Sequence, residues 1–202
     1  MILVTCAVNK ELAFFESRPH VEMLVTGVGP VEAAASVSRA LAQSRPELVI
    51  NAGIAGAFKD CAEIGEGVVV SDDSLALCLE TGAPIGLPDG ASVVDRASSD
   101  LALVDRLVEL GFRSVRGVTV TQVTAIDGTA ARLASQGVAI ETMEGFAVLR
   151  AAEIAGVPAI EVRGISNIAG DRSRSGWDFD AGVLGLQRVL NALLSLVGTK
   201  DG

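Results

Sequence analysis

The stretch of sequence that decides the fold is residues 140–172, IETMEGFAVLRAAEIAGVPAIEVRGISNIAGDR. Its apolar positions follow the spacing of an α-helix, which gives one face that can pack on a sheet: Met143, Phe146, Ala147, Ala151 and Ile154. Thr142 can cap the start of this helix. Residues 158–165 then predict a strand, with Glu161 and Arg163 interrupting its apolar run. A helix followed closely by a strand indicates an α/β layer.

Polar residues lie at the ends of both predicted elements. Glu144 stands at the start of the helix, and Ser166 and Asn167 follow the strand. In α/β sheets, ligands bind where strands end and helices begin. The stretch therefore predicts a pocket that contains Glu144 and Asn167.

The rest of the chain alternates strands with helices. Strands are predicted at residues 1–7, 20–26, 47–51, 67–71 and 116–121, and helices at residues 9–17, 30–43, 100–110, 129–135 and 179–197. Residues 79–92 are rich in Gly and Pro and predict a long loop, which either covers a site or lies on the surface. The alternation predicts an α/β protein with a three-layer α/β/α sandwich, formed by a single domain over residues 1–202.

Composition argues against several classes of protein. The formal net charge is −9, whereas a nucleic-acid site needs a basic face, so we expect no nucleic-acid partner. We expect no membrane association either, because no apolar run approaches the roughly 20 residues that span a bilayer. We also expect no secretion signal, because the first residues read as a strand without a basic region before it. The cysteines, Cys6, Cys61 and Cys78, lack metal-binding spacing and predict reduced thiols in a cytoplasmic protein.

Two glycine-containing turns, at residues 27–29 and 53–56, do not predict a nucleotide cofactor. Glu32 stands where a dinucleotide fingerprint needs Gly or Ala, and no Walker lysine follows either turn. We expect the backbone there to approach a ligand or a helix closely. His20 is the only histidine, which disfavours a Ser-His-Asp triad and a His-rich metal site. No metal ion and no cofactor are expected.

Three residues are candidates for chemistry, and each has a plainer interpretation. Glu11 is either a surface acid favoured by a helix dipole or a general base that activates water. Glu144 is either a first-turn acid or, beside the apolar Met143 and Phe146, a carboxylate that needs a polar partner such as a sugar diol. Asn167 either holds a turn or reads the edge of a base with its amide.

Several motifs together resemble the purine nucleosidase and phosphorylase superfamily. They are AVNKELAFF (7–15), TGVGPVEAAAS (26–36), NAGIAGAF (51–58), ETMEGFAV (141–148) and VRGISNIAGDR (162–172). Within that superfamily, residues 119–134 and 165–179 look most like futalosine hydrolases. The resemblance implies a mixed central sheet of the nucleoside phosphorylase type. It also implies hydrolysis of the N-glycosidic bond of futalosine, releasing hypoxanthine and dehypoxanthine futalosine in menaquinone biosynthesis, by a homo-oligomer that is a dimer or larger.

The resemblance also implies roles for individual residues. Glu11 falls on the water-activating glutamate of related nucleosidases, and Met143 with Glu144 falls on the pair that holds the ribose. Arg163 and Ser166 match supporting residues of the same site. The remaining expected substrate-binding residues are Ile126 and Trp177, which lie in the two segments similar to futalosine hydrolases.

Asn167 falls where methylthioadenosine nucleosidases have an aspartate that protonates the base. A 6-oxopurine presents two adjacent acceptors, N7 and O6, to which one amide NH2 can donate. Adenine presents a donor at its 6-amino group, which suits a protonated carboxyl instead. Asn167 therefore favours hypoxanthine. Because an amide is no general acid, the departing base must be helped by hydrogen bonding alone, by solvent, or by an acid such as Asp171.

The far end of the substrate is less well defined by the sequence. Arg172 or Arg174 can meet the benzoate carboxylate of futalosine, and residues 80–92 can close over it, although a solvated loop is an equally simple interpretation. Ile54 replaces a serine of related nucleosidases, and Ala125 replaces a stacking aromatic. The alternatives are another purine nucleosidase (methylthioadenosine, adenosylhomocysteine or inosine type), a phosphate-dependent phosphorylase, and a nucleoside-binding module without turnover.

Overall fold

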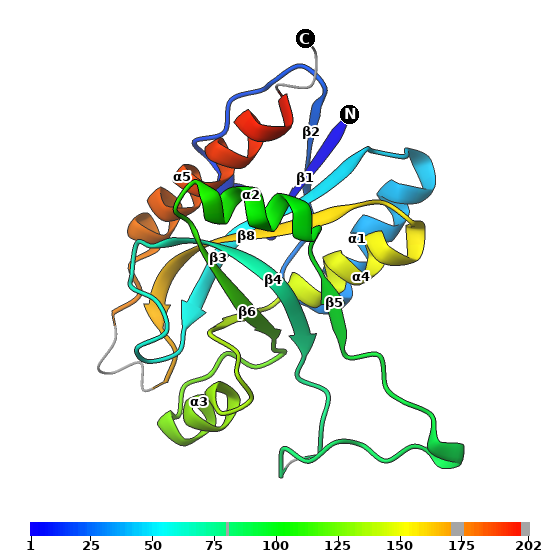
Figure 1. Ribbon diagram of the computed structural model, residues 1–202, viewed down its shortest axis with the longest axis vertical. Helices are drawn as coiled ribbons and strands as arrows, with labels where there is room; N and C mark the ends of the chain where they lie inside the picture. The colour runs from blue at the N-terminus through cyan, green and yellow to red at the C-terminus, as the bar shows by residue number, and fades with distance from the viewer. Residues whose placement is uncertain (80, 171–175, 199–202) are drawn as a thin grey trace.

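A computed structural model describes residues 1–79, 81–170 and 176–198 (Figure 1). Its strands all belong to one eight-stranded sheet. The strands are β1 (Ile2–Cys6), β2 (Val21–Val25), β3 (Leu48–Ala57), β4 (Gly67–Leu75), β5 (Arg96–Ser98), β6 (Arg113–Thr119), β7 (Ile140–Thr142) and β8 (Ala159–Ile168).

The centre of the sheet is a closed ring of strands. β8 pairs with β3 in parallel and with β4 antiparallel. β4 and β7 both pair with β6 in parallel, and β7 closes the ring by an antiparallel pairing with β3. β1 and β2 extend the sheet beyond β3, and β5 extends it beyond β4. The sheet is therefore mixed, as the resemblance implied.

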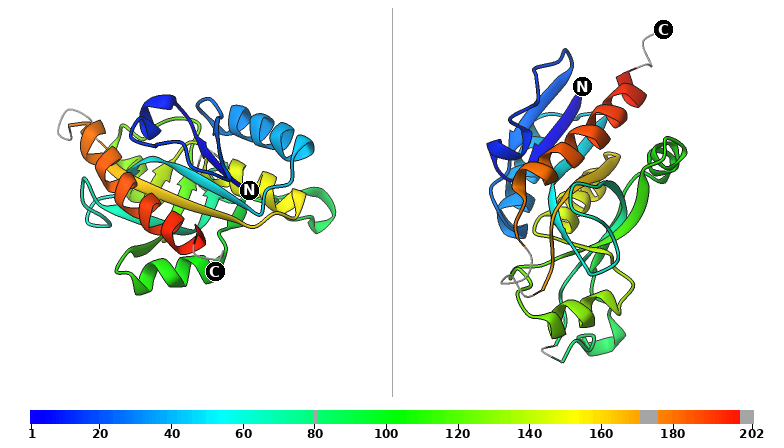
Figure 2. Two further views of the ribbon diagram at one scale, coloured as in Figure 1. Left: turned by 90° about the horizontal axis from the view of Figure 1, so that it is seen from above. Right: turned by 90° about the vertical axis from the view of Figure 1, so that its left-hand side faces the viewer.

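Helices cover both faces of the sheet (Figures 1 and 2). The α-helices are α1 (Pro30–Gln43), α2 (Leu101–Glu109), α3 (Asp127–Ala134), α4 (Gly145–Ala155) and α5 (Phe179–Gly198), and the 3-10 helices are η1 (Asn9–Leu12) and η2 (Pro88–Gly90). One hydrophobic cluster joins α2 and α5 to the sheet, and a second joins α1 and α4 to it. The predicted three-layer architecture is confirmed.

The helix α5 lies very close to β8 because glycines face each other. A Cβ atom on Gly164 would stand 1.8 Å from the carbonyl oxygen of Gly182. Among the described residues, α5 is long and apolar enough to cross a membrane, judged by its length and composition alone. This corrects the expectation that no such run exists. However, Leu186, Val189 and Leu190 are buried in the core, as expected of a helix that packs on a sheet.

The structure changes several predicted boundaries. The predicted helix at residues 9–17 is a short 3-10 helix, and the predicted turn at residues 53–56 lies inside β3. β8 continues past residue 165, so Asn167 lies in a strand and not in a loop. Ile154 was expected on the buried face of its helix but is exposed.

Candidate active site

A cavity of about 360 Å³ opens at the ends of β3, β7 and β8. It is lined by Ala7, Val8, Glu11, Val28, Ile54, Ala55, Gly56, Val120, Val123, Glu141, Thr142, Met143, Glu144, Ser166, Asn167, Trp177 and Phe179. Six of the residues expected in a substrate site are thereby brought together: Glu11, Met143, Glu144, Ser166, Asn167 and Trp177.

Glu11 lies in η1 with only 4% of its surface exposed. Its Oε2 accepts hydrogen bonds from the backbone N–H groups of Ala7 (2.9 Å) and Val8 (3.1 Å). Its Oε1 accepts one from the N–H of Ile54 at 3.0 Å. The interpretation as a solvent-facing acid is therefore wrong, because three backbone donors fix this carboxylate in the wall of the cavity.

Glu144 is the residue that immediately precedes α4, and it is also buried. Its Oε1 accepts a 2.9 Å hydrogen bond from the N–H of Gly29, which has a φ of 96°. The glycine turn at residues 27–29 thus approaches a site residue closely, as expected. Burial raises the pKa of Glu144 above its ordinary value, although the charge of Arg163 and the bond from Gly29 oppose the increase.

The start of α4 is held by threonine hydroxyls from two strands. Thr142 Oγ1 accepts a bond from the N–H of Gly145 at 3.2 Å, so Thr142 does bind the helix start, although the N-cap residue of α4 is Glu144. Thr119 Oγ1 accepts from the N–H of Phe146 at 2.8 Å. Both hydroxyls donate to the carboxyl group of Asp73, a buried residue that sequence reasoning did not single out. Burial and the nearby Glu161 raise the pKa of Asp73 well above its ordinary value.

Arg163 lies behind the cavity and does not line it. Its side chain is 1% exposed, and its Nε donates to Glu161 Oε1 at 2.8 Å. A Cβ atom on Gly53 would lie 2.2 Å from Arg163 Nη1 and 2.9 Å from Glu11 Oε1. The absence of a side chain at Gly53 therefore makes room for the guanidinium group and the carboxylate. Burial alone would lower the pKa of Arg163, but the carboxylates of Glu161, Glu144 and Glu11 outweigh it and raise this pKa. Arg163 therefore balances the acidic groups of the site from behind.

A chain of hydrogen bonds orients the amide of Asn167. The indole N–H of Trp177 donates to Ser166 Oγ at 3.2 Å, and that hydroxyl lies 3.0 Å from Asn167 Oδ1 and 3.2 Å from the carbonyl oxygen of Ala55. Because the hydroxyl already accepts from the indole, its proton is available to Asn167 Oδ1. The register between β3 and β8 shifts here, so that Ser166 forms a bulge, a common way to re-aim side chains beside a site.

Some expected residues lie elsewhere. Ile126 does not line the cavity and is 68% exposed just before α3, so its expected place in the pocket is not found. Asp171, Arg172 and Arg174 lie outside the described residues. None of the described residues of the 80–92 loop lines this cavity either.

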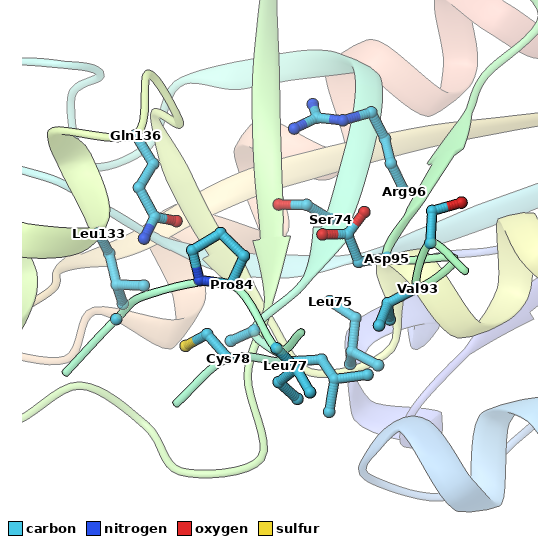
Figure 3. Close-up of a pocket in the computed structure, with 14 residues that line it drawn as sticks. Ser74, Leu75, Leu77, Cys78, Pro84, Val93, Asp95, Arg96, Leu133 and Gln136 are labelled. Atoms are coloured by element: carbon cyan, nitrogen blue, oxygen red, sulfur yellow. The ribbon is translucent and has the colours of Figure 1, made fainter. Parts of the chain in front are cut away.

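The loop after β4 instead lines a separate cavity of about 530 Å³, shared with α3 (Figure 3). Its charged lining residues are Asp95 and Arg96, and Arg96 is already paired with Asp72. The smaller cavity is the candidate active site, because it gathers Glu11, Glu141, Glu144 and Asn167.

The candidate site favours a ligand that offers hydroxyl and N–H donors. Its described lining contains three carboxyl groups and one amide but no Arg or Lys. Glu141, which the sequence reasoning did not select, accepts from the N–H of Thr124 with both carboxylate oxygens at 3.3 Å. Such a lining fits a polyhydroxylated, nitrogen-containing molecule better than a phosphate anion.

This fold and site define a nucleoside-processing protein of the phosphorylase superfamily, whose family model matches residues 10–197. The chain belongs to that superfamily and, within it, to the futalosine hydrolase family.

Two relatives show that the chain belongs to the futalosine hydrolase family. A futalosine hydrolase of Thermus thermophilus is 33% identical over 87% of this chain and 81% of its own length. A futalosine hydrolase of Streptomyces coelicolor is 34% identical over 77% of this chain and 71% of its own length. The expected family is therefore confirmed.

Solved structures confirm the fold. The 5′-methylthioadenosine/S-adenosylhomocysteine nucleosidase of Helicobacter pylori, in complex with butyl-thio-DADMe-Immucillin-A, superimposes with a TM-score of 0.82. It covers 96% of this chain and 97% of its own, at 16% identity. At that identity the likeness extends to the fold alone.

Proposed function

We propose that this protein hydrolyses the N-glycosidic bond of futalosine and releases hypoxanthine and dehypoxanthine futalosine. The observation that carries the proposal is the presence of Glu11, Glu144 and Asn167 around one cavity. It is supported by the family to which the chain belongs, since the relatives above are named for this hydrolysis.

The two glutamates suit the sugar and the water. Cleavage of a glycosidic bond passes through an oxocarbenium-like state with positive charge on the sugar. Glu144 accepts hydrogen bonds from the ribose hydroxyls, and its charge favours that cation. Glu11, fixed by its backbone donors, takes a proton from the water that attacks C1′ while the bond to N9 breaks.

The amide suits the departing base. Asn167 Nδ2 donates to the acceptors of a 6-oxopurine and stabilises the negative charge that develops on it. Met143, Ser166 and Trp177 complete the substrate-binding wall, with Ser166 and Trp177 keeping the amide in its orientation. Arg163 serves the site by balancing its carboxylates.

Phosphate-dependent cleavage is the competing reaction, because the matching family model is that of the phosphorylase superfamily. A phosphorylase needs cationic groups converging on the anion. The described lining of the cavity contains none, which favours water as the nucleophile.

The experiment that tests the proposal is incubation with futalosine, inosine and methylthioadenosine, with and without phosphate, followed by chromatography of the released base. We expect hypoxanthine from futalosine at a rate independent of phosphate. Glu11→Gln should lower kcat by about 10²- to 10⁴-fold, the usual contribution of a general base, while binding of hypoxanthine nucleosides persists. Glu16→Gln is the matched control, because Glu16 is exposed and lies in the same segment.

Three outcomes would overturn the proposal: a rate that depends on phosphate, adenine as the preferred released base, or full turnover by Glu11→Gln. We further propose a cytoplasmic homo-oligomer, a dimer or larger, acting in menaquinone biosynthesis. Light scattering coupled to size-exclusion chromatography tests the oligomer, and a monomer at micromolar concentration would contradict it.

A further inference from the structure

We propose that Glu141 is a specificity-determining residue that, with Asn167, recognises the N1–H and C6=O edge of a 6-oxopurine. The inference rests on the proposed function, since it places the base of the substrate in the cavity lined by Glu11, Glu144 and Asn167.

The sheet places the acid and the amide on either side of one glycine. Gly56 of β3 is paired with Glu141 of β7 on one side and with Asn167 of β8 on the other. The three residues therefore form a row across three adjacent strands at the wall of the cavity.

The glycine allows both side chains to approach the same point. A Cβ atom on Gly56 would lie 3.0 Å from Asn167 Nδ2 and 3.3 Å from Glu141 Oε1. An amide NH2 and a carboxylate oxygen thus lie beside each other where a larger residue would separate them. Both residues are nearly buried, at 9% and 5% exposure, so a ligand that contacts them is shielded from water.

The hydrogen-bond partners of the two groups assign them opposite roles. The hydroxyl of Ser166 occupies Asn167 Oδ1, which directs the amide NH2 toward Gly56 as a donor. The N–H of Thr124 contacts both oxygens of Glu141, which makes this carboxylate an acceptor. A carboxylate has about four lone-pair sites, so it can accept a further bond from a ligand.

A donor beside an acceptor complements a lactam. In a 6-oxopurine, N7 and O6 accept hydrogen bonds and the neighbouring N1–H donates one. Asn167 Nδ2 serves the acceptors and Glu141 serves N1–H. A 6-aminopurine presents a donor at C6 and a bare acceptor at N1, so it opposes both protein groups. Because mismatched buried polar groups are strongly disfavoured, two such mismatches select the oxopurine more strongly than Asn167 alone.

The test is a comparison of base binding by wild-type protein, Glu141→Gln and Glu141→Ala, using hypoxanthine, adenine and 1-methylhypoxanthine in calorimetric titrations. Losing a hydrogen bond to a charged group corresponds to about ten- to hundredfold in affinity. We expect the preference for hypoxanthine over adenine to fall by that factor in Glu141→Gln, which keeps the shape of the side chain. Wild-type protein should also reject 1-methylhypoxanthine, which lacks the N1–H, and Glu141→Ala should lose that discrimination.

Glu109→Gln is the control, because it removes the same charge from an exposed position on α2. A purely structural Glu141 would change thermal stability in the variants without changing the ratio of affinities. An unchanged ratio in both variants, with the wild-type preference intact, overturns the role of Glu141 but leaves the proposed function standing. Failure of wild-type protein to bind either base or to release hypoxanthine would instead overturn the proposed function, and the role of Glu141 with it.

Discussion

Replacing Arg163 by Met should be among the most damaging single changes in this protein. Arg163 and Glu161 form an ion pair at 2.8 Å whose side chains are 1% and 0% exposed. Removing one partner of a buried pair typically costs about 3–5 kcal/mol, because the remaining charge stays desolvated. Folded domains are stable by only about 5–15 kcal/mol in total, so the variant should approach the limit of folding.

The structure also predicts an asymmetry between the two partners. Arg163 faces the carboxylates of Glu161, Glu144 and Glu11, whereas Glu161 faces one cation and the acids Glu144 and Asp73. Glu161→Gln leaves Arg163 with two carboxylates and should cost less than Arg163→Met. In the double variant Glu161→Gln, Arg163→Met, the loss should be smaller than the sum of the single losses by about 2 kcal/mol, within the range measured for directly interacting residues.

Urea unfolding of the three variants at pH 7, read as changes in midpoint at constant m-value, measures these differences. Activity supplies a second measurement. Arg163 lowers the pKa of Glu144, so the acid limb of kcat/KM should move to higher pH in Arg163→Met. A cost below about 1 kcal/mol for Arg163→Met, the size of an exposed ion pair, would refute this reasoning. Strictly additive losses, or an unmoved acid limb, would refute it as well.

Further predictions follow from other shifted groups. Burial raises the pKa of Glu144 above 4.5, so wild-type kcat/KM should fall as pH drops through that raised value, and the residual activity of Glu144→Gln should lack this limb; a flat wild-type profile would contradict it. The pKa of Asp73 is raised above 3.8, so the folded state retains a proton that the unfolded chain releases, and stability is lost as pH rises toward the folded pKa. Asp73→Asn should flatten that loss in urea midpoints between pH 4 and 8, and an equal slope in both proteins would disprove the assignment. Burial raises the pKa of Cys6 to about 12, so iodoacetamide at pH 8 should label the half-buried Cys61 and Cys78 before Cys6, as read by mass spectrometry of the folded protein.

The periodicity of apolar residues predicted those helices and strands whose buried faces are visible in a short stretch of sequence. α4 and the start of β8 were found because helical spacing and an apolar run are local signals. Ile154 was misplaced because several faces of a short, largely apolar helix satisfy the same spacing. The predicted strand ended too early, at residue 51, because glycine is uncommon inside strands and β3 contains Gly53 and Gly56. The space that these glycines leave is used by side chains from other elements.

Some residues of the candidate site could be predicted from the sequence in the same way, and others could not. Glu11, Glu144 and Asn167 were found because each was predicted to lie near the start or end of an element and matches a motif of the family. Asp73 and Glu141 lie among many acids in the sequence, and nothing local distinguishes them. Their importance comes from pairings between distant strands, which a single sequence does not display.

The buried acidic groups around the site depend on glycines as well as on their charged partner Arg163. A Cβ atom on Gly145 would lie 2.3 Å from Asp73 Oδ2 and 2.6 Å from Glu161 Oε1, and one on Gly53 would displace Arg163. Gly56 leaves the same kind of space for Glu141 and Asn167. Carboxyl, amide and guanidinium groups from several elements meet at these three positions, and residues without a side chain leave room for them. A larger residue at any of these glycines would therefore displace a polar or charged side chain in or beside the site.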